Sequence, residues 1–164
     1  MDKETIDLIK TSYFTPTIEN GEIKVIKKDD IKYSYRYTSF KDNKDIIILS
    51  AVLKLEMGDK NESLNLIKSR LERRIASQPL EYPSAGSVFR NPDGDFAGRL
   101  IEECNLKGFN INGAYVSDKH ANFIINKDNA SGEDIKNLLL HIKRTVKDKT
   151  DIDLINEQEI IDWS

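Results

Sequence analysis

The most informative part of the sequence is the stretch Gln78-Pro-Leu-Glu-Tyr-Pro-Ser-Ala-Gly-Ser-Val-Phe-Arg-Asn-Pro92. It holds three of the four prolines of the chain around a centre of small residues. Proline fixes φ and removes a backbone donor, so this composition predicts a shaped loop. Within the loop, Gly86 would let the backbone approach a ligand closely, and Ser87 would present its hydroxyl at a tight turn. The residues alone fit a plain serine-rich turn equally well.

Amphipathic patterns on both sides of this stretch predict helices. A capping pair, Asp59 and Glu62, precedes a helix that Pro79 would end. A short helix is predicted over 96–105, and a second capping pair, Ser131 and Asp134, precedes a long helix. The apolar residues expected on the inner faces of the three helices are Leu64, Ile67, Leu71 and Ile75; Ala97, Leu100, Ile101 and Cys104; and Ile135, Leu138, Leu139, Ile142 and Val146.

Apolar runs between turn signals predict strands in both halves of the chain. The predicted strands are 14–18 and 22–26 around an Asn20-Gly21 hairpin turn, then 45–56, 111–117, 121–126 and 151–155, with a tail over 157–163. The mixture predicts an α+β fold. A change in composition near Gly58 suggests a boundary between residues 1–57, which are rich in predicted strands, and an α+β part over 58–164.

Composition excludes several classes of protein. Lys and Arg number 25 against 28 Asp and Glu, which gives a net charge of −3, whereas nucleic-acid binders usually carry a basic excess. The longest apolar run, Ile46–Leu49, is far shorter than a membrane span, and the N-terminus lacks the layout of a secretory signal. One cysteine and two histidines do not support a disulfide framework or a metal site. We therefore expect no nucleic acid, membrane or metal partner.

Two further segments carry candidate chemistry. Arg36 lies among aromatic residues in the run Tyr33-Ser-Tyr-Arg-Tyr-Thr-Ser-Phe40, where stacking could aim it at an anion, although the residues alone favour an edge strand with a surface arginine. Glu157 follows the last predicted strand and could act as a general acid, although a solvated terminal charge is the commoner case. His120 and Cys104 are interpreted as a turn residue and a core residue.

Together, several motifs strongly resemble the UDP-N-acetylenolpyruvoylglucosamine reductase family, in its shorter variety with the Gln-Pro-Leu-Glu-Tyr-Pro loop. The resemblance covers about residues 15–163. The motifs are the stretch 78–92, Phe96-Ala-Gly-x-Leu-Ile-Glu, Leu106-Lys-Gly, Val116-Ser-x-Lys-His-Ala-x-Phe-Ile-x-Asn126, and Tyr35-Arg36 upstream. The resemblance implies a cytoplasmic flavoenzyme of peptidoglycan synthesis, in which FAD passes a hydride from NADPH to the enolpyruvyl group of UDP-N-acetylglucosamine enolpyruvate.

The resemblance also assigns roles to individual residues. It implies that Ser87 donates the proton and that Arg36 and Glu157 polarise the substrate carboxylate. An arginine fork suits a carboxylate, and a serine needs positive charge nearby to act as an acid. Arg73 and Asn91 are implied substrate contacts. The chain departs from the family pattern in having Ser77 where a lysine is usual, Gln158-Glu159 in place of Val-Arg, and Asn112 in place of a glycine.

The resemblance further implies that the glycine-rich half that binds FAD precedes this segment. Residues 1–57 are then the end of a split FAD-binding domain, and 58–164 are the substrate-binding domain. The FAD-binding half would be missing or supplied by a separate chain. Two alternatives stay open: an inactive module that binds the nucleotide sugar, and a diverged interaction protein that kept the fold.

Overall fold

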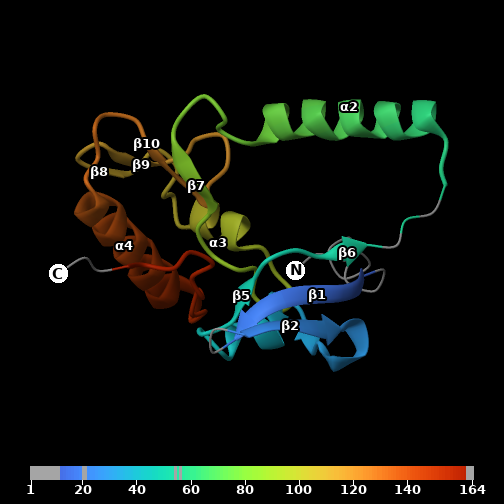
Figure 1. The fold of residues 1–164 in the computed structure, drawn as a ribbon. Coiled ribbons are helices and arrows are strands. Elements are labelled where there is room, and N and C mark those ends of the chain that lie inside the picture. The colour runs from blue at the N-terminus through green and yellow to red at the C-terminus, as the bar shows by residue number, and fades with distance from the viewer. Residues whose placement is uncertain (1–11, 20–21, 54, 56, 162–164) are drawn as a thin grey trace. The chain divides into compact units, whose positions relative to one another are not determined.

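The computed structural model describes residues 12–19, 22–53, 55 and 57–161 (Figure 1). The chain divides into two compact units, which meet in the sequence between Lys60 and Asn61. Strands dominate the first unit, and helices and strands alternate in the second. The α+β class predicted from the sequence is confirmed. No helix among the described residues is long and apolar enough to cross a membrane.

The first unit is built on β1 (Ser12–Glu19), which pairs antiparallel with β2 (Glu22–Lys27). These strands confirm the two flanks of the predicted hairpin, whereas its turn residues Asn20 and Gly21 lie outside the described residues. On its other edge β1 pairs with β5 (Ile47–Ile48) and β6 (Val52–Leu53).

The single strand predicted over 45–56 is therefore wrong in detail, because a break separates β5 from β6. Ile48 lies opposite Thr17 and Val52 lies opposite Phe14. The chain thus advances four residues (48 to 52) against three on β1 (17 to 14). The extra residue interrupts the ladder in the manner of a β-bulge.

The remaining elements of the first unit are short. They are a 3₁₀ turn η1 (Lys28–Asp30), the hairpin strands β3 (Tyr33–Ser34) and β4 (Tyr37–Thr38), and a second 3₁₀ turn η2 (Ser39–Lys41). Several apolar side chains of this unit are exposed: Ile23, Val25, Ile47, Ile48, Leu49, Val52 and Leu53.

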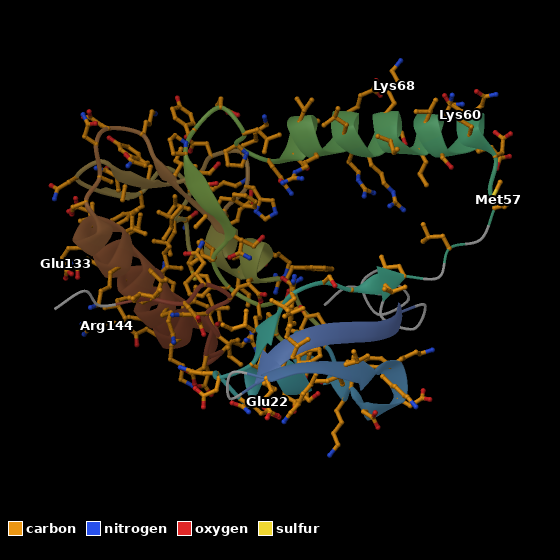
Figure 2. The ribbon with its side chains drawn as sticks, in the orientation of Figure 1. Glu22, Met57, Lys60, Lys68, Glu133 and Arg144 are labelled. Atoms are coloured by element: carbon orange, nitrogen blue, oxygen red, sulfur yellow. The ribbon has the colours of Figure 1, made fainter. Side chains whose placement is uncertain are left out.

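Helix α2 (Lys60–Ser77) begins directly after Asp59 and ends before Pro79, as the sequence predicts. Every residue of α2 is exposed, including the predicted apolar face of Leu64, Ile67, Leu71 and Ile75. In Figure 2 the side chains of Lys60 and Lys68 project outward from this helix. The helix predicted from the amphipathic pattern is confirmed, whereas the prediction that its apolar face is buried is wrong.

The second unit contains an antiparallel sheet and two further helices. The sheet has the order β7 (Ser84–Ser87), β10 (Phe123–Asn126), β9 (Ala114–Val116) and β8 (Asn110–Ile111). The helices are α3 (Ala97–Glu103) and α4 (Gly132–Thr150). The capping box of α4 is confirmed, since the Ser131 hydroxyl accepts from the Asp134 N–H and the Asp134 carboxylate accepts from the Ser131 N–H. Glu133 and Arg144 point outward from α4 in Figure 2.

The core of the second unit lies between α3, α4 and the sheet. The inward residues predicted for α3 are buried, as are most of those predicted for α4, with Ile135 half-buried. The largest fully buried side chains of this core are Val88, Phe89, Leu100, Ile101, Val116, Leu138, Leu139, Ile142, Val146 and Leu154. Phe89 and Val88 follow Ser87 directly, so the segment after β7 is anchored in the core.

Three predictions for the second unit need correction. The stretch 78–92 is not only a loop, because residues 84–87 pair with β10 as β7. Residues 111–117 are not one strand, since Asn112 and Gly113 turn the chain between β8 and β9. Residues 151–155 form no strand, and only Asn156 makes an isolated bridge, to Phe89. For 84–87 and the C-terminal region the distant partner decided the outcome, whereas for 111–117 a two-residue turn divided a run that its apolar pattern had joined.

Candidate functional site

Ser87 stands at the end of β7, opposite Phe123 of β10. The residue before it, Gly86, has φ +81°, a conformation that glycine adopts at little cost and that other residues avoid. The Ser87 side chain is half-buried. This left-handed conformation directly precedes the Ser87 hydroxyl, while the close approach of a ligand to Gly86 stays a prediction.

Glu157 is brought to the segment that follows Ser87 by main-chain hydrogen bonds. The Glu157 N–H donates to the Val88 carbonyl at 2.8 Å, and the Arg90 N–H donates to the Ile155 carbonyl at 2.8 Å. The Gln158 side-chain amide donates to the Gly86 carbonyl at 3.4 Å. Two of the predicted catalytic residues, 70 positions apart in the sequence (157 − 87), are thus placed on adjacent backbone segments.

Arg90 forms an ion pair with Glu157, with 3.4 Å between Nε and Oε2. The side chains of this pair are 35% and 25% exposed, although the facing Nε and Oε2 atoms are themselves buried. Its effect is on geometry, because it orients the Glu157 carboxylate. Sequence reasoning did not single out Arg90, although it lies three residues after Ser87 in the most informative stretch.

A cavity of about 450 Å³ opens beside Ser87. Arg74 at the end of α2 lines it, and the Arg74 Nε donates to the Gln78 side-chain oxygen at 3.0 Å, which orients the guanidinium. A guanidinium fork is suited to phosphate and carboxylate oxygens. The lining residues are Arg74, Gln78, Leu80, Tyr82, Pro83, Ser84, Gly86, Ser87 and Phe123.

The two predicted substrate contacts lie elsewhere. Arg73 is not among the residues that line this cavity, and its carbonyl accepts from the Ser77 hydroxyl at 2.8 Å. The Asn91 side-chain oxygen accepts from the Ala97 N–H at 3.1 Å, which satisfies a free donor at the start of α3. Arg74, which the sequence reasoning missed, is one helix position from Arg73 and faces the cavity instead.

Arg36 belongs to the first unit, in the two-residue turn between β3 and β4. Its φ of 57° is uncommon for a residue other than glycine and costs of order 1–3 kcal/mol, a strain found more often at functional sites. The guanidinium lies 5.7 Å from the centre of the Tyr35 ring, and the Lys41 ammonium donates to the Arg36 carbonyl at 3.0 Å. The guanidinium thus lies near an aromatic ring, while the role of Arg36 stays a prediction.

The described residues do not fit FAD. In glycine-rich dinucleotide-binding loops, closely spaced glycines let backbone amides cradle the diphosphate. The described glycines with positive φ are Gly86, Gly94 and Gly108, which stand singly in separate loops. Among the described residues there is also no group of three or more His, Cys, Asp or Glu side chains that could hold a metal ion.

Comparisons with known proteins agree on one family. Residues 78–161 match the family model described as UDP-N-acetylenolpyruvoylglucosamine reductase, C-terminal domain. The chain is 47% identical over 143 residues to the UDP-N-acetylenolpyruvoylglucosamine reductase of Clostridium tetani and 46% identical over 143 residues to that of Fervidobacterium nodosum. Each alignment covers 87% of this chain and 46% of the relative.

A solved structure supports the same relationship. The crystal structure of UDP-N-acetylenolpyruvylglucosamine reductase from Thermus caldophilus matches with a TM-score of 0.76 and 28% identity, over 92% of this chain and 53% of that one. The chain thus spans about half the length of the relatives that it matches.

Proposed function

Because the chain belongs to the UDP-N-acetylenolpyruvoylglucosamine reductase family, as its motifs predicted, we propose that it supplies the substrate-binding and proton-donating part of such a reductase. The observation that carries this proposal is the hydrogen bond from the Glu157 N–H to the Val88 carbonyl, which brings Glu157 next to the segment that bears Ser87. The substrate is UDP-N-acetylglucosamine enolpyruvate and the product is UDP-N-acetylmuramate. The reaction serves peptidoglycan synthesis in the cytoplasm.

Ser87 is the proposed proton donor. Reduction of the enolpyruvyl double bond adds a hydride to one carbon and a proton to the other, and the Ser87 hydroxyl delivers that proton. A serine is a poor acid in water, so fixed positive charge must stabilise its alkoxide. The cavity beside Ser87 offers one such charge in Arg74, which Gln78 holds by a 3.0 Å hydrogen bond.

Arg36 and Glu157 are the proposed partners of the substrate carboxylate. The fork of Arg36 can bind both carboxylate oxygens, which withdraws charge from the double bond and stabilises the enolate-like intermediate. Arg36 lies in the two-residue loop that joins β3 and β4. The ion pair with Arg90 directs the Glu157 carboxylate toward the segment that follows Ser87.

The diphosphate of the nucleotide sugar is the proposed partner of α2. Arg74 lines the cavity and offers a fork of donors suited to phosphate oxygens. Arg73, one residue before it, and Asn91 stay predicted contacts with the substrate. The exposed end of α2 leaves both arginines accessible to a ligand of this size.

The two electrons of the reduction come from outside the described residues. The family resemblance implies NADPH and FAD, but the isolated glycines of this chain do not fit the FAD diphosphate. We assign residues 1–57 to the end of a FAD-binding domain and 58–164 to the substrate-binding domain. The proposed partner of this chain is the FAD-binding half, on the same or a separate polypeptide.

The test joins the full chain behind the part of the Clostridium tetani relative that precedes the matched region. The fusion should reduce UDP-N-acetylglucosamine enolpyruvate with NADPH. In the fusion, Ser87→Ala should slow substrate reduction by at least about 10²-fold, the low end of what a positioned acid contributes, and leave reduction of the flavin by NADPH unchanged. Stopped-flow flavin absorbance separates these two steps.

The matched control is Ser69→Ala, since Ser69 lies on exposed α2 and its hydroxyl donates to the Leu66 carbonyl within the same helix. It should leave both steps unchanged. If Ser87→Ala slows both steps equally, Ser87 shapes the site without delivering the proton. A fusion that binds the nucleotide sugar but reduces none of it would favour the inactive binding module.

A further inference from the structure

Asn122, directly before β10, makes an unusual set of contacts with the segment after Ser87. Its side chain is almost fully buried, with 4% exposed. The side-chain oxygen accepts from the Phe89 N–H at 3.0 Å, and the side-chain amide donates to the Phe89 carbonyl at 2.8 Å. The Asn122 main-chain carbonyl accepts from the Val88 N–H at 2.9 Å. The Asn122 side chain therefore pairs with the Phe89 backbone as the main chain of a neighbouring strand residue would.

The opposite edge of the same segment binds the C-terminal region. The Val88 carbonyl accepts from the Glu157 N–H, and the Arg90 N–H donates to the Ile155 carbonyl. Residues 88–90 are thus held between Asn122 on one side and residues 155–157 on the other. Ser87 and Glu157 are both attached to this segment, one by the peptide bond and the other by a hydrogen bond.

Only a carboxamide suits the position of Asn122. The Phe89 N–H needs an acceptor and the Phe89 carbonyl needs a donor, and the planar amide supplies both. Aspartate would keep the acceptor but would turn a second oxygen toward the Phe89 carbonyl. Alanine would leave both backbone groups of Phe89 unpaired in the core, at a cost of 1–3 kcal/mol each.

We propose that Asn122 is a positioning residue, which sets Ser87 and Glu157 relative to each other by clamping residues 88–90 against residues 155–157. This inference rests on the proposed roles of Ser87 and Glu157. A displacement of about 1 Å at a reacting group can cost 10²-fold in rate, so loosening this clamp slows the protonation step without a change in any group that touches the substrate.

Asn126 provides a matched control on the same strand. It stands at the other end of β10, where its side-chain oxygen accepts from the Ala130 N–H at 2.9 Å and its amide donates to the Ala130 carbonyl at 3.3 Å. It thus makes the same pair of bonds with the backbone of one residue, but it holds the turn before α4. Asn126→Asp removes the same chemistry as Asn122→Asp, at the end of β10 remote from Ser87.

The first measurement uses the full chain. Hydrogen exchange of the Phe89, Arg90 and Glu157 amides should accelerate at least tenfold in Asn122→Asp, and should not change in Asn126→Asp. The second measurement uses the fusion with the Clostridium tetani segment. Asn122→Asp should slow substrate reduction by about 10²-fold at saturating substrate and leave flavin reduction by NADPH unchanged. Asn122→Ser, whose hydroxyl can bond to one of the two Phe89 groups, should reduce the substrate at a rate between those of the unaltered fusion and Asn122→Asp. It also serves as the test variant if Asn122→Asp does not fold.

The double variant Ser87→Ala with Asn122→Asp should be no slower than Ser87→Ala by more than about twofold, because both act on one step and are coupled. Equal slowing by Asn122→Asp and Asn126→Asp, or full additivity, would overturn the inference and leave the proposed role of Ser87 standing. If Ser87→Ala itself has no effect, the proposed function fails, and the positioning role falls with it.

Discussion

Gly113 offers a sharp test of the packing described for the second unit. It lies in the turn between β8 and β9 and is buried. A Cβ added at this position would lie 1.9 Å from the Asp128 carbonyl oxygen and 2.7 Å from the Ala130 nitrogen. Both are backbone atoms, so no flexible side chain can move aside. We therefore expect Gly113→Ala to displace the whole turn over 128–130.

The size of the effect follows from the bonds that this displacement breaks. Ordinary contact begins at 3.4 Å, so the Asp128 carbonyl must move by about 1.5 Å (3.4 − 1.9). The Gly113 carbonyl accepts from the Lys127 N–H at 2.9 Å and from the Asp128 N–H at 3.3 Å, and such a shift takes both out of range. At about 0.5–1.5 kcal/mol each, with added strain, the free energy of unfolding should fall by about 2–4 kcal/mol.

The matched control is Gly132→Ala, at the first residue of α4. A Cβ there meets nothing within 4 Å. Alanine favours helix over glycine by about 0.5–1 kcal/mol, so this variant should be unchanged or slightly more stable. The same substitution is thus expected to act with opposite signs at two glycines of one unit.

The assay is urea unfolding followed by circular dichroism at 222 nm. The three α-helices of the described chain, α2, α3 and α4, lie almost entirely in the second unit, so this signal follows the unit that contains both glycines. Ordinary surface substitutions change the free energy of unfolding by about 0.5 kcal/mol or less. If the value for Gly113→Ala lies within that range of the unaltered chain, the close approach of residues 113 and 128 is refuted.

Three further predictions concern charge and ligands. The His120 Nδ1 accepts from the Asn122 N–H at 3.2 Å, and burial lowers the pKa of His120 from 6.5, so the folded chain favours the neutral ring. The free energy of unfolding should therefore fall as the pH drops below 6.5, because the unfolded chain takes up the proton more readily. A His120→Gln variant with the same pH dependence as the unaltered chain would contradict this. Arg74→Gln should weaken binding of UDP-N-acetylglucosamine enolpyruvate about tenfold by calorimetry, because one charge-assisted bond is lost. Arg144→Gln, on the exposed side of α4, should leave the affinity unchanged. Equal affinities of the two variants would show that Arg74 is not part of the site. The purified chain should show no flavin absorbance after incubation with FAD and gel filtration, because its described glycines stand singly. A stoichiometric yellow protein would contradict this prediction.

Features that depend on local chemistry could be predicted from the sequence. The capping box of α4 needs only Ser131 and Asp134, and its inner face follows from the helical period, so both are found in the structure. The buried face of α3 was predicted for the same reason. The end of α2 before Pro79 follows from the missing N–H of proline. In all these cases the residues that decide the structure are neighbours along one element.

Features that depend on pairing between distant segments were predicted less well. Residues 84–87 form a strand because β10 lies beside them, which no pattern within the proline-rich stretch reports. At the candidate site the family motifs named Arg73, whose role stays a prediction, and did not name Arg74, which lines the cavity. Adjacent helix residues point about 100° apart, so one position decides whether a guanidinium faces the cavity. That direction is set by how α2 joins the loop at Gln78, where the Arg74 contact forms.

The C-terminal region shows why the site itself is the hardest part to predict. A strand was predicted over 151–155, but a local pattern reports which side chains are buried and not which backbone groups are paired. Leu154 is indeed buried, yet the paired residues are the next three, 155–157, and Glu157 is one of them. Glu157 is bonded to the Val88 carbonyl, and the next residue, Phe89, is bonded to the side chain of Asn122, 33 positions after it. A candidate site assembled in this way is fixed by main-chain bonds, which side-chain patterns do not encode, so its residues could be named from family motifs while its geometry required the structure.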